Sequence, residues 1–331
     1  MKNPSSDGRR LWLAMRFLSL LPLSVTTGLG AFLAGLITWL PLRYASAYRV
    51  VLINLLATHP QMSYAEACRI GRQSMKELGR TLTEFTHVWN RPVQETLGRI
   101  SMIEGEQAFL EATASERPVL LLSLHQGSWE ISNLYLGDKG NILVMYQPHP
   151  ATLMDAVVKA ARERTGSRLI PTNAQGVKAA LGALQKGGTL AILADHNPGN
   201  RSNPFVPFFG YRVPTPALID KFIQRYRPHV FVVSCFRGEG GVKDIRLRFE
   251  PAPEIEQAGD TEAVLTAMNA GLQRCIDRNL TQYQWTYKRF KWTHSGRRTW
   301  YRQSYPLLKR ARRGESRESL GLLPGPEDSP S

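Results

Sequence analysis

Short apolar runs and amphipathic stretches alternate along the chain from about residue 100. Apolar runs bounded by turn residues predict strands. These runs lie at Val119–His125, Asn141–Gln147, Arg168–Thr172, Thr189–Asp195, His229–Phe236 and Ile245–Pro251. Helical spacing of apolar residues predicts helices near 129–137, 152–165, 175–186, 214–226 and 260–278. We therefore expect an α/β fold with a mostly parallel sheet flanked by helices, and functional groups beyond the carboxyl ends of its strands.

The N-terminal region contains a long uncharged segment. No residue from Phe17 to Leu42 is charged, and about 20 mostly apolar residues are enough to cross a bilayer. We therefore expect an N-terminal membrane helix. Pro22 and several glycines interrupt the run, so a bent or re-entrant insertion is an alternative, and a cleaved signal peptide is another. Arginines flank the segment on both sides, so charge does not decide its orientation.

Two further helices are expected before the first strand. Residues 43–58 are mostly apolar. Ser63 and Glu66 form an S-x-x-E capping box, and apolar residues then recur at helical spacing as far as Val88. The N-terminal leader and membrane segment thus occupy residues 1–42, and we assign residues 43–295 to the α/β domain.

The C-terminal region has a different composition. From Arg278 to Gly314 there are eleven lysines and arginines, no acidic residue, and interleaved aromatic residues. Such a segment suits a single-stranded nucleic acid, but it suits an anionic membrane surface equally well. The membrane segment favours the second interpretation. Residues 296–331 are predicted to form this basic aromatic extension and a tail, from Glu315 onward, that is expected to be disordered.

Charge and cysteine content narrow the range of functions. Lys and Arg number 42 and Asp and Glu 27, which gives a net charge of +15 and favours an anionic partner. Three dispersed cysteines suit a reduced compartment better than a disulfide framework. No Cys or His spacing is typical of a zinc site. We expect no cofactor, and the lack of a phosphate loop and of a G-x-G-x-x-G motif gives nucleotide binding no support. The lack of a G-x-S-x-G elbow argues against an α/β-hydrolase.

The most informative motif is His125 followed five residues later by Glu130. An apolar strand ends at the histidine, and Gly127 and Ser128 suit a turn into a helix whose first turn holds Glu130. A carboxylate can orient one imidazole nitrogen and leave the other to take a proton from a substrate hydroxyl. The alternative is a core histidine at a strand end and a glutamate that only favours a helix N-terminus; spacing alone does not exclude it.

Two further groups of residues are candidates for binding. Asp195 ends a predicted strand and opens a polar loop that leads to the aromatic run Phe205–Gly210. Such a run can line an apolar groove for an acyl chain, although Phe208 and Phe209 taken alone suit a packed core better. Arg162 and Arg164 lie at the end of a predicted helix, where the helix dipole favours cations in any case.

Three of these segments resemble the bacterial lipid A late acyltransferases, the lauroyl/myristoyl transferase family. His125–Glu130 is similar to the family's H-x-G-x-W-E motif. Asp195–Gly199 and Phe205–Gly210 resemble its D-Q-x-x-G and F-V-P-F-F-G blocks. Gln282–Lys291 is similar to its closing Q-Y-x-W-x-x-x-R-F segment. The resemblance spans roughly residues 10–295.

The resemblance implies a glycerolipid-acyltransferase-like fold and transfer of a fatty acyl group to a hydroxyl of lipid A or a related membrane glycolipid. The donor would be acyl carrier protein or acyl-coenzyme A. It implies His125 as general base and Glu130 as its orienting acid. It implies substrate contacts by Asp195, Arg164 and the Phe208-Phe209-Gly210 block. The expected location is the bacterial inner membrane, with the catalytic domain on the cytoplasmic face.

The chain departs from the family pattern at several positions. His196 stands where Gln is usual, Tyr146–Pro148 where an Arg before Pro is common, and Pro150–Thr152 where an Asn-Pro pair is expected. A different acceptor lipid is therefore an open alternative. So are an N-acyltransferase that uses an amine acceptor and a non-catalytic protein that binds anionic lipid or nucleic acid through residues 278–313.

Overall fold

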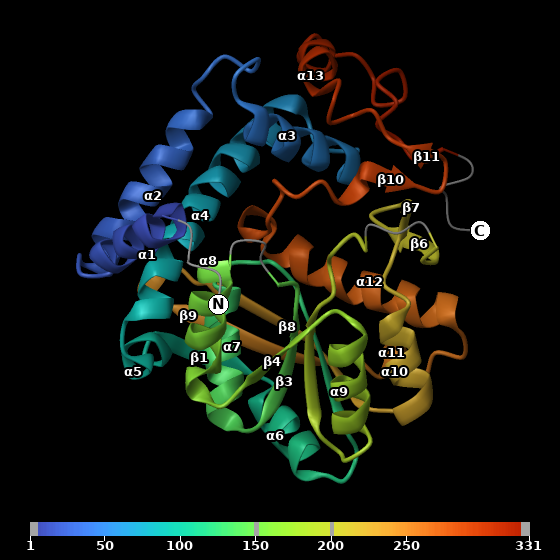
Figure 1. The fold of residues 1–331 in the computed structure, drawn as a ribbon. Coiled ribbons are helices and arrows are strands. Elements are labelled where there is room, and N and C mark those ends of the chain that lie inside the picture. The colour runs from blue at the N-terminus through green and yellow to red at the C-terminus, as the bar shows by residue number, and fades with distance from the viewer. Residues whose placement is uncertain (1–5, 149–151, 199–201, 326–331) are drawn as a thin grey trace. The chain divides into compact units, whose positions relative to one another are not determined.

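A seven-stranded sheet organises the fold in the computed structural model, which describes residues 6–148, 152–198 and 202–325. The strand order is β1-β9-β8-β2-β5-β3-β4 (Figure 1). The strands are β1 (Ile100–Glu104), β2 (Val119–Ser123), β3 (Ile142–Tyr146), β4 (Arg168–Pro171), β5 (Thr189–Leu193), β8 (His229–Arg237) and β9 (Ile245–Pro251). Adjacent strands are parallel except β8 and β9. The predicted α/β fold with a mostly parallel sheet is confirmed.

Helices flank this sheet (Figure 1). Helix α6 (Glu106–Ala114) contacts β9, α7 (Trp129–Lys139) contacts β8 and β3, and α9 (Ala174–Leu184) contacts β3, β4 and β5. Successive strand residues point to opposite faces of a sheet, and β2 is buried along Val119–Leu122. Both of its faces are therefore covered, which explains why the strand is apolar throughout instead of alternating.

The chain divides into two compact units. Unit 1 contains residues up to 29, 80–194 and 221–256, and so holds the whole sheet; unit 2 contains residues 30–79, 195–220 and those from 257 onward. Three of the five boundaries fall within helices, namely α2 (Leu23–Ile37), α4 (Tyr64–Asn90) and α10 (Leu218–Tyr226). Residues 43–295, which the sequence assigns to the α/β domain, contribute to both units, and that assignment stays a prediction.

The remaining helices are divided between the two units. They are α5 (Val93–Leu97), α8 (Thr152–Arg162) and α11 (Pro253–Glu256) in unit 1, and α3 (Ser46–Thr58), α12 (Thr261–Arg278) and α13 (Ser304–Arg312) in unit 2. Helices α3 and α4 confirm the two predicted between the membrane segment and the sheet. The backbone N–H of Glu66 donates to Ser63 Oγ (3.1 Å), so Ser63 caps α4 as expected.

The N-terminal apolar segment forms two helices instead of one. Helix α1 (Ser6–Leu18) begins within the predicted leader, and α2 follows after Pro22. In the described part of the chain, no single helix has the length and hydropathy to cross a membrane. Arg10–Leu18 and Leu23–Ile37 meet that requirement only together, with a bend of 120° between them. A single straight membrane helix is therefore not what the structure shows.

Helix α2 carries its large apolar side chains outward. Val25, Leu29, Phe32, Leu33 and Leu36 are exposed, whereas the buried positions hold small residues. The buried positions are Thr26, Thr27, Gly30, Ala31 and Gly35. In unit 2, a Cβ added at Gly79 of α4 would lie 2.1 Å from the carbonyl oxygen of Gly30, so glycine is required for this close approach. A helix of a water-soluble protein has the opposite arrangement.

Unit 2 also contains the C-terminal region. Helix α13 packs on α3, and Leu307 and Leu308 of α13 are buried. The tail differs from expectation as far as Gly325, because Leu322 is fully buried and its carbonyl oxygen accepts a hydrogen bond from Tyr211 Oη (2.8 Å). The rest of the predicted disordered tail, residues 326–331, lies outside the described residues.

Candidate functional site

His125 lies just beyond the carboxyl end of β2, the central strand of the sheet. Leu124 is buried, and His125 is half-buried with its ring centroid 5.2 Å from that of Trp129 in a T-shaped arrangement. Gly127 follows with a φ of 55°, in the left-handed region that glycine occupies without strain. Helix α7 then begins at Trp129. The local order of strand, turn and helix is the one that the sequence predicts.

Glu130 lies in the first turn of α7 with 3% of its surface exposed. Arg162, the last residue of α8, donates from Nε to Glu130 Oε2 at 2.9 Å and from Nη2 to Oε1. Trp89 Nε1 donates to Oε2 at 3.2 Å. Both carboxylate oxygens therefore accept hydrogen bonds, and the charge of Glu130 is paired within unit 1.

The pKa of Glu130 reports how these groups interact. Burial raises this pKa, but the charge and hydrogen bonds of Arg162, the Trp89 hydrogen bond and the charge of His125 together lower it below its ordinary value. Glu130 therefore stays ionised at neutral pH. Because His125 is among the groups that influence this pKa, the two residues of the predicted dyad lie close enough to interact electrostatically. Their catalytic role stays a prediction.

Two arginines near the end of α8 have different partners. Arg164 was expected to bind substrate phosphate, but its guanidinium donates to the backbone carbonyls of Ala161, Arg91 and Val88. It is Arg162 that pairs with Glu130. The sequence offers little signal for this choice, because the paired residues are 32 positions apart.

A small cavity lies beside the Glu130–Arg162 pair. Its volume is about 50 Å³, enough for a few water molecules. Apart from Glu130, Arg162 and three small polar side chains, its walls are apolar, and they are formed by Trp129, Leu136, Val144, Met145, Ala191, Ile192 and Leu193. The pair therefore borders a small apolar space that is lined by residues of α7 and of the strands β2, β3 and β5.

In unit 2, Asp195 is buried, with 3% of its surface exposed. Burial and the charge of Asp195 raise the pKa of Tyr283 well above its ordinary value. Burial lowers the pKa of Arg289, against the opposing effects of Tyr283, Tyr287 and Asp195. Asp195 and the closing segment of the resemblance thus lie together. Arg289 Nη1 also donates to the Pro214 carbonyl (3.0 Å).

Phe208, Phe209 and Gly210 belong to a hairpin of β6 (Phe205–Phe208) and β7 (Tyr211–Pro214). Phe209 and Gly210 form its two-residue turn, with φ values of 50° and 78°. Phe208 and Phe209 are buried, and their rings pack on Phe290 and Trp285 respectively. This is the packed-core alternative considered for them. Contact with an acyl chain stays a prediction.

An open pocket in unit 2 was not foreseen from the sequence. It has a volume of about 420 Å³ and is lined by Asn197, Thr286, Tyr287, Lys288, Lys291 and Trp292. Its lining carries two lysines and no carboxylate, so it favours an anionic group. Its position, between the Asp195 loop and the closing segment, was hidden because those two segments are some 90 residues apart in the sequence.

Two of the departures from the family pattern are described. The ring of His196 lies 5.5 Å from that of Tyr287, and Tyr146 Oη donates to Asp155 Oδ2 at 3.4 Å. Pro150 and Ala151, like Gly199 of the Asp195 loop, lie outside the described residues. Within the described ranges, no group of three or more His, Cys, Asp or Glu side chains is arranged to hold a metal ion.

Comparison with known proteins agrees with this arrangement of motifs. The family model described as bacterial lipid A biosynthesis acyltransferase matches residues 10–292. The chain belongs to this family. It is 25% identical to the lipid A biosynthesis lauroyltransferase of Escherichia coli K12 over 281 residues, which cover 85% of this chain and 89% of that protein.

Two further relatives of this family are similarly distant. The lipid A biosynthesis palmitoleoyltransferase of E. coli K12 is 24% identical over 238 residues, 72% of this chain and 76% of the relative. The lipid A biosynthesis acyltransferase of Haemophilus influenzae is 21% identical over 240 residues, 72% of this chain and 75% of the relative. The resemblance seen in the sequence is thereby confirmed at the level of the lipid A acyltransferase family.

Proposed function

We propose that this protein is a membrane-associated O-acyltransferase. It transfers a fatty acyl chain from the thioester of acyl carrier protein, or of coenzyme A, to a hydroxyl of lipid A or a related glycolipid. The observation that carries this proposal is the half-buried His125 beside a buried, ionised Glu130 at the end of the central strand, in a chain of the lipid A acyltransferase family. No cofactor takes part in the proposed reaction.

In this mechanism, His125 is the general base. One imidazole nitrogen takes the proton of the acceptor hydroxyl while the hydroxyl oxygen attacks the thioester carbonyl carbon. Glu130 stabilises the imidazolium that forms, and Arg162 and Trp89 keep its carboxylate in place. The tetrahedral intermediate then expels the thiolate, which takes the proton from His125. Ester and free thiol leave, and both residues return to their starting states.

Substrate binding follows from charge and from the family blocks. The net charge of +15 suits an acidic carrier protein and an anionic glycolipid. The lysine-lined pocket of unit 2 suits a phosphate group of either substrate. Asp195, Phe208, Phe209, Gly210 and Arg164 remain the predicted substrate contacts.

Membrane association is proposed for the α1–α2 segment. Twelve large apolar side chains between residues 11 and 44 are exposed, and five of them form the outward face of α2, whose inner residues are small. Exposed apolar surface of this kind marks an interaction with a membrane or a partner, and small residues at helix contacts are typical of membrane helices. We propose the bacterial inner membrane, with the catalytic units on its cytoplasmic face, where the thioester donor is made.

The test is mass spectrometry of membrane lipids from cells that carry the wild-type protein, the His125→Ala variant or neither. We expect one lipid to gain the mass of one acyl chain with the wild type alone. Cleavage of that product by alkaline hydroxylamine would identify an ester, whereas resistance would indicate an amine acceptor. An equal gain with His125→Ala would refute the proposed base.

A further inference from the structure

The turn that separates His125 from Glu130 is fixed by side chains that do not belong to the motif. Gly127 and Ser128 form this turn. The Ser128 backbone N–H donates to the carbonyl of Cys235 on β8 (3.1 Å), and Thr81 Oγ1 of α4 donates to the carbonyl of Gly127 (3.0 Å). The turn is thus bonded on one side to the sheet and on the other to α4, all within unit 1.

Ser128 occupies the N-cap position of α7 but does not cap the helix. A serine at this position usually accepts a hydrogen bond from a backbone N–H of the first helical turn. Here its hydroxyl donates to Glu84 Oε2 at 2.6 Å. The hydroxyl therefore anchors the turn to α4, and its role is not the local one that the sequence position suggests.

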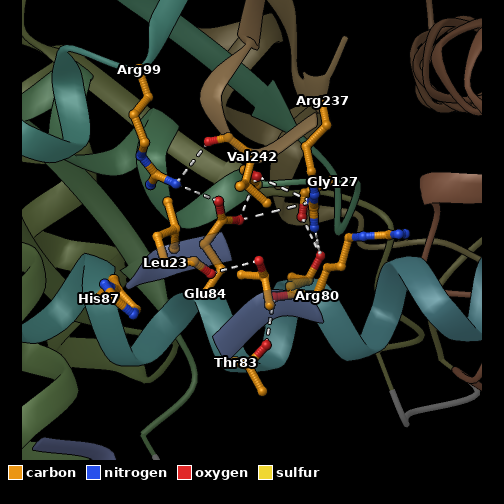
Figure 2. Close-up of polar contacts among 12 residues, drawn as sticks. Leu23, Arg80, Thr83, Glu84, His87, Arg99, Gly127, Arg237 and Val242 are labelled. Carbon is orange, nitrogen blue, oxygen red and sulfur yellow. Dashed lines mark hydrogen bonds and ion pairs between the residues drawn. The ribbon is translucent and has the colours of Figure 1, made fainter. Parts of the chain in front are cut away.

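Arg237, at the end of β8, joins these contacts. Its Nη1 donates to Ser128 Oγ at 3.2 Å and lies 3.8 Å from Glu84 Oε2, and its Nη2 donates to Thr81 Oγ1. Glu84 is also bound by Arg99, whose Nη1 donates to Oε1 at 2.7 Å and to the Val242 carbonyl at 3.2 Å. Figure 2 shows Arg99 and Arg237 on opposite sides of Glu84, with Gly127 next to Arg237.

The network is buried. Glu84 and Arg237 have side chains that are 1% and 2% exposed, and that of Arg99 is 11% exposed. Buried ion pairs of this kind stabilise a fold less than apolar residues of the same volume would, and polar networks of this kind can instead specify one arrangement. Three hydrogen bonds join this network to the turn, one at the Gly127 carbonyl and two at the Ser128 hydroxyl, so the arrangement that it specifies includes the turn.

We propose that Thr81, Glu84 and Arg237 are positioning residues that set the geometry of the catalytic turn. They act through Gly127 and Ser128 and hold His125 in register with Glu130. The same helix, α4, carries Trp89, which donates to Glu130, so one helix positions both ends of the motif. This inference rests on the proposed acyl transfer.

Thr81→Val tests the proposal, because valine keeps the shape of threonine and removes the hydroxyl that links Arg237 to the Gly127 carbonyl. In the full-length protein with an acyl carrier protein thioester and the acceptor found with the wild type, we expect kcat to fall about 10- to 100-fold. Values of KM should stay within about twofold, because the change affects alignment in the transition state and not binding. Thr81→Ser should restore most of kcat.

Thr83→Val is the matched control. Thr83 lies on the same helix two residues away, and its hydroxyl donates to the Arg80 carbonyl (3.1 Å) within α4 (Figure 2). Its kcat should equal that of the wild type. A Thr81→Val variant that matches Thr83→Val, or that changes only KM, would overturn the proposal.

Two further variants keep these outcomes decisive. If Thr81→Val does not fold, Ser128→Ala removes the bond to Glu84, and the same loss of kcat with unchanged KM is expected; wild-type kcat would overturn the proposal. His125→Ala is measured in parallel. If His125→Ala is active, the proposal of acyl transfer through His125 is refuted. If His125→Ala is inactive while Thr81→Val and Ser128→Ala are as active as the wild type, only the proposed positioning role is refuted.

Discussion

The two acids of the family motifs, Glu130 in unit 1 and Asp195 in unit 2, have different surroundings. Both follow strands in the sequence, and both are 3% exposed. Glu130 has a guanidinium on its carboxylate and a half-exposed histidine nearby. Asp195 faces two groups that are buried as deeply as it is, Tyr283 and Arg289. Similar positions in the sequence thus lead to one acid that is paired with an arginine close to a histidine, and to another that is surrounded by buried aromatic side chains and an arginine.

The largest effect on turnover should come from replacing His125, the proposed general base. His125→Ala should lower turnover about 10²- to 10⁴-fold. Because His125 is only half-buried, the free energy of unfolding should change little. Single-turnover kinetics and urea unfolding of the same preparation measure both quantities. Turnover near that of the wild type would place the chemistry elsewhere.

Phe208→Ala in unit 2 should mainly affect stability, whereas His125→Ala should mainly affect turnover. Its ring is 2% exposed and packs on Phe290, and the Arg289 guanidinium lies 5.5 Å from its centroid. We expect the free energy of unfolding to fall by about 3–5 kcal/mol. If Phe208 instead lines the acyl groove, the variant will keep its stability and accept a different chain length, which product mass spectrometry would show.

Arg162 and Arg164 allow a matched comparison within one turn. Arg162→Ala leaves the buried carboxylate of Glu130 without its main partner, so it should cost about 3 kcal/mol of stability and reduce turnover as well. Arg164→Ala removes hydrogen bonds to backbone carbonyls and should cost about 1 kcal/mol, with the KM for the acceptor unchanged. An increase in that KM would instead support the predicted contact between Arg164 and substrate phosphate.

The smallest expected effect is the contribution of Glu130 to the stability of the protein in acid. The pKa of Glu130 is lower in the folded protein than the ordinary value of about 4.3. Its contribution to stability is therefore fully present above that value and is lost as the pH falls through the lower, folded-state pKa. Urea unfolding of the wild type and Glu130→Gln from about pH 7 to about pH 3 should show a stability difference that shrinks in acid. A constant difference would contradict the lowered pKa.

The sequence predicts those parts of the fold that rest on local patterns. The strands near 119, 142, 189 and 229 have nearly continuous apolar runs, the strand near 245 alternates apolar and polar residues, and Ser63 caps its helix as predicted. Strand β1 (Ile100–Glu104) was missed because it lies at the sheet edge and two of its five residues are exposed. The β6–β7 hairpin was missed because Phe209 has a positive φ, which residues other than glycine rarely adopt.

The candidate site was predictable only in part, for a related reason. His125 and Glu130 lie five residues apart, so one turn brings them together. The contacts Glu130–Arg162 and Ser128–Arg237 join residues 32 and 109 positions apart. Local sequence patterns do not predict such pairs, because these contacts form only when the strands have taken their order in the sheet.

The inverted burial of α2 determines how this protein must be handled. Its outward face offers bulky hydrocarbon to the solvent and keeps threonine hydroxyls and glycines inside. In plain buffer, copies of the chain should cover that face with one another, and preparations should elute as large aggregates. A detergent micelle or a nanodisc belt would replace those neighbours, so the choice of amphiphile will determine whether single, active molecules are obtained.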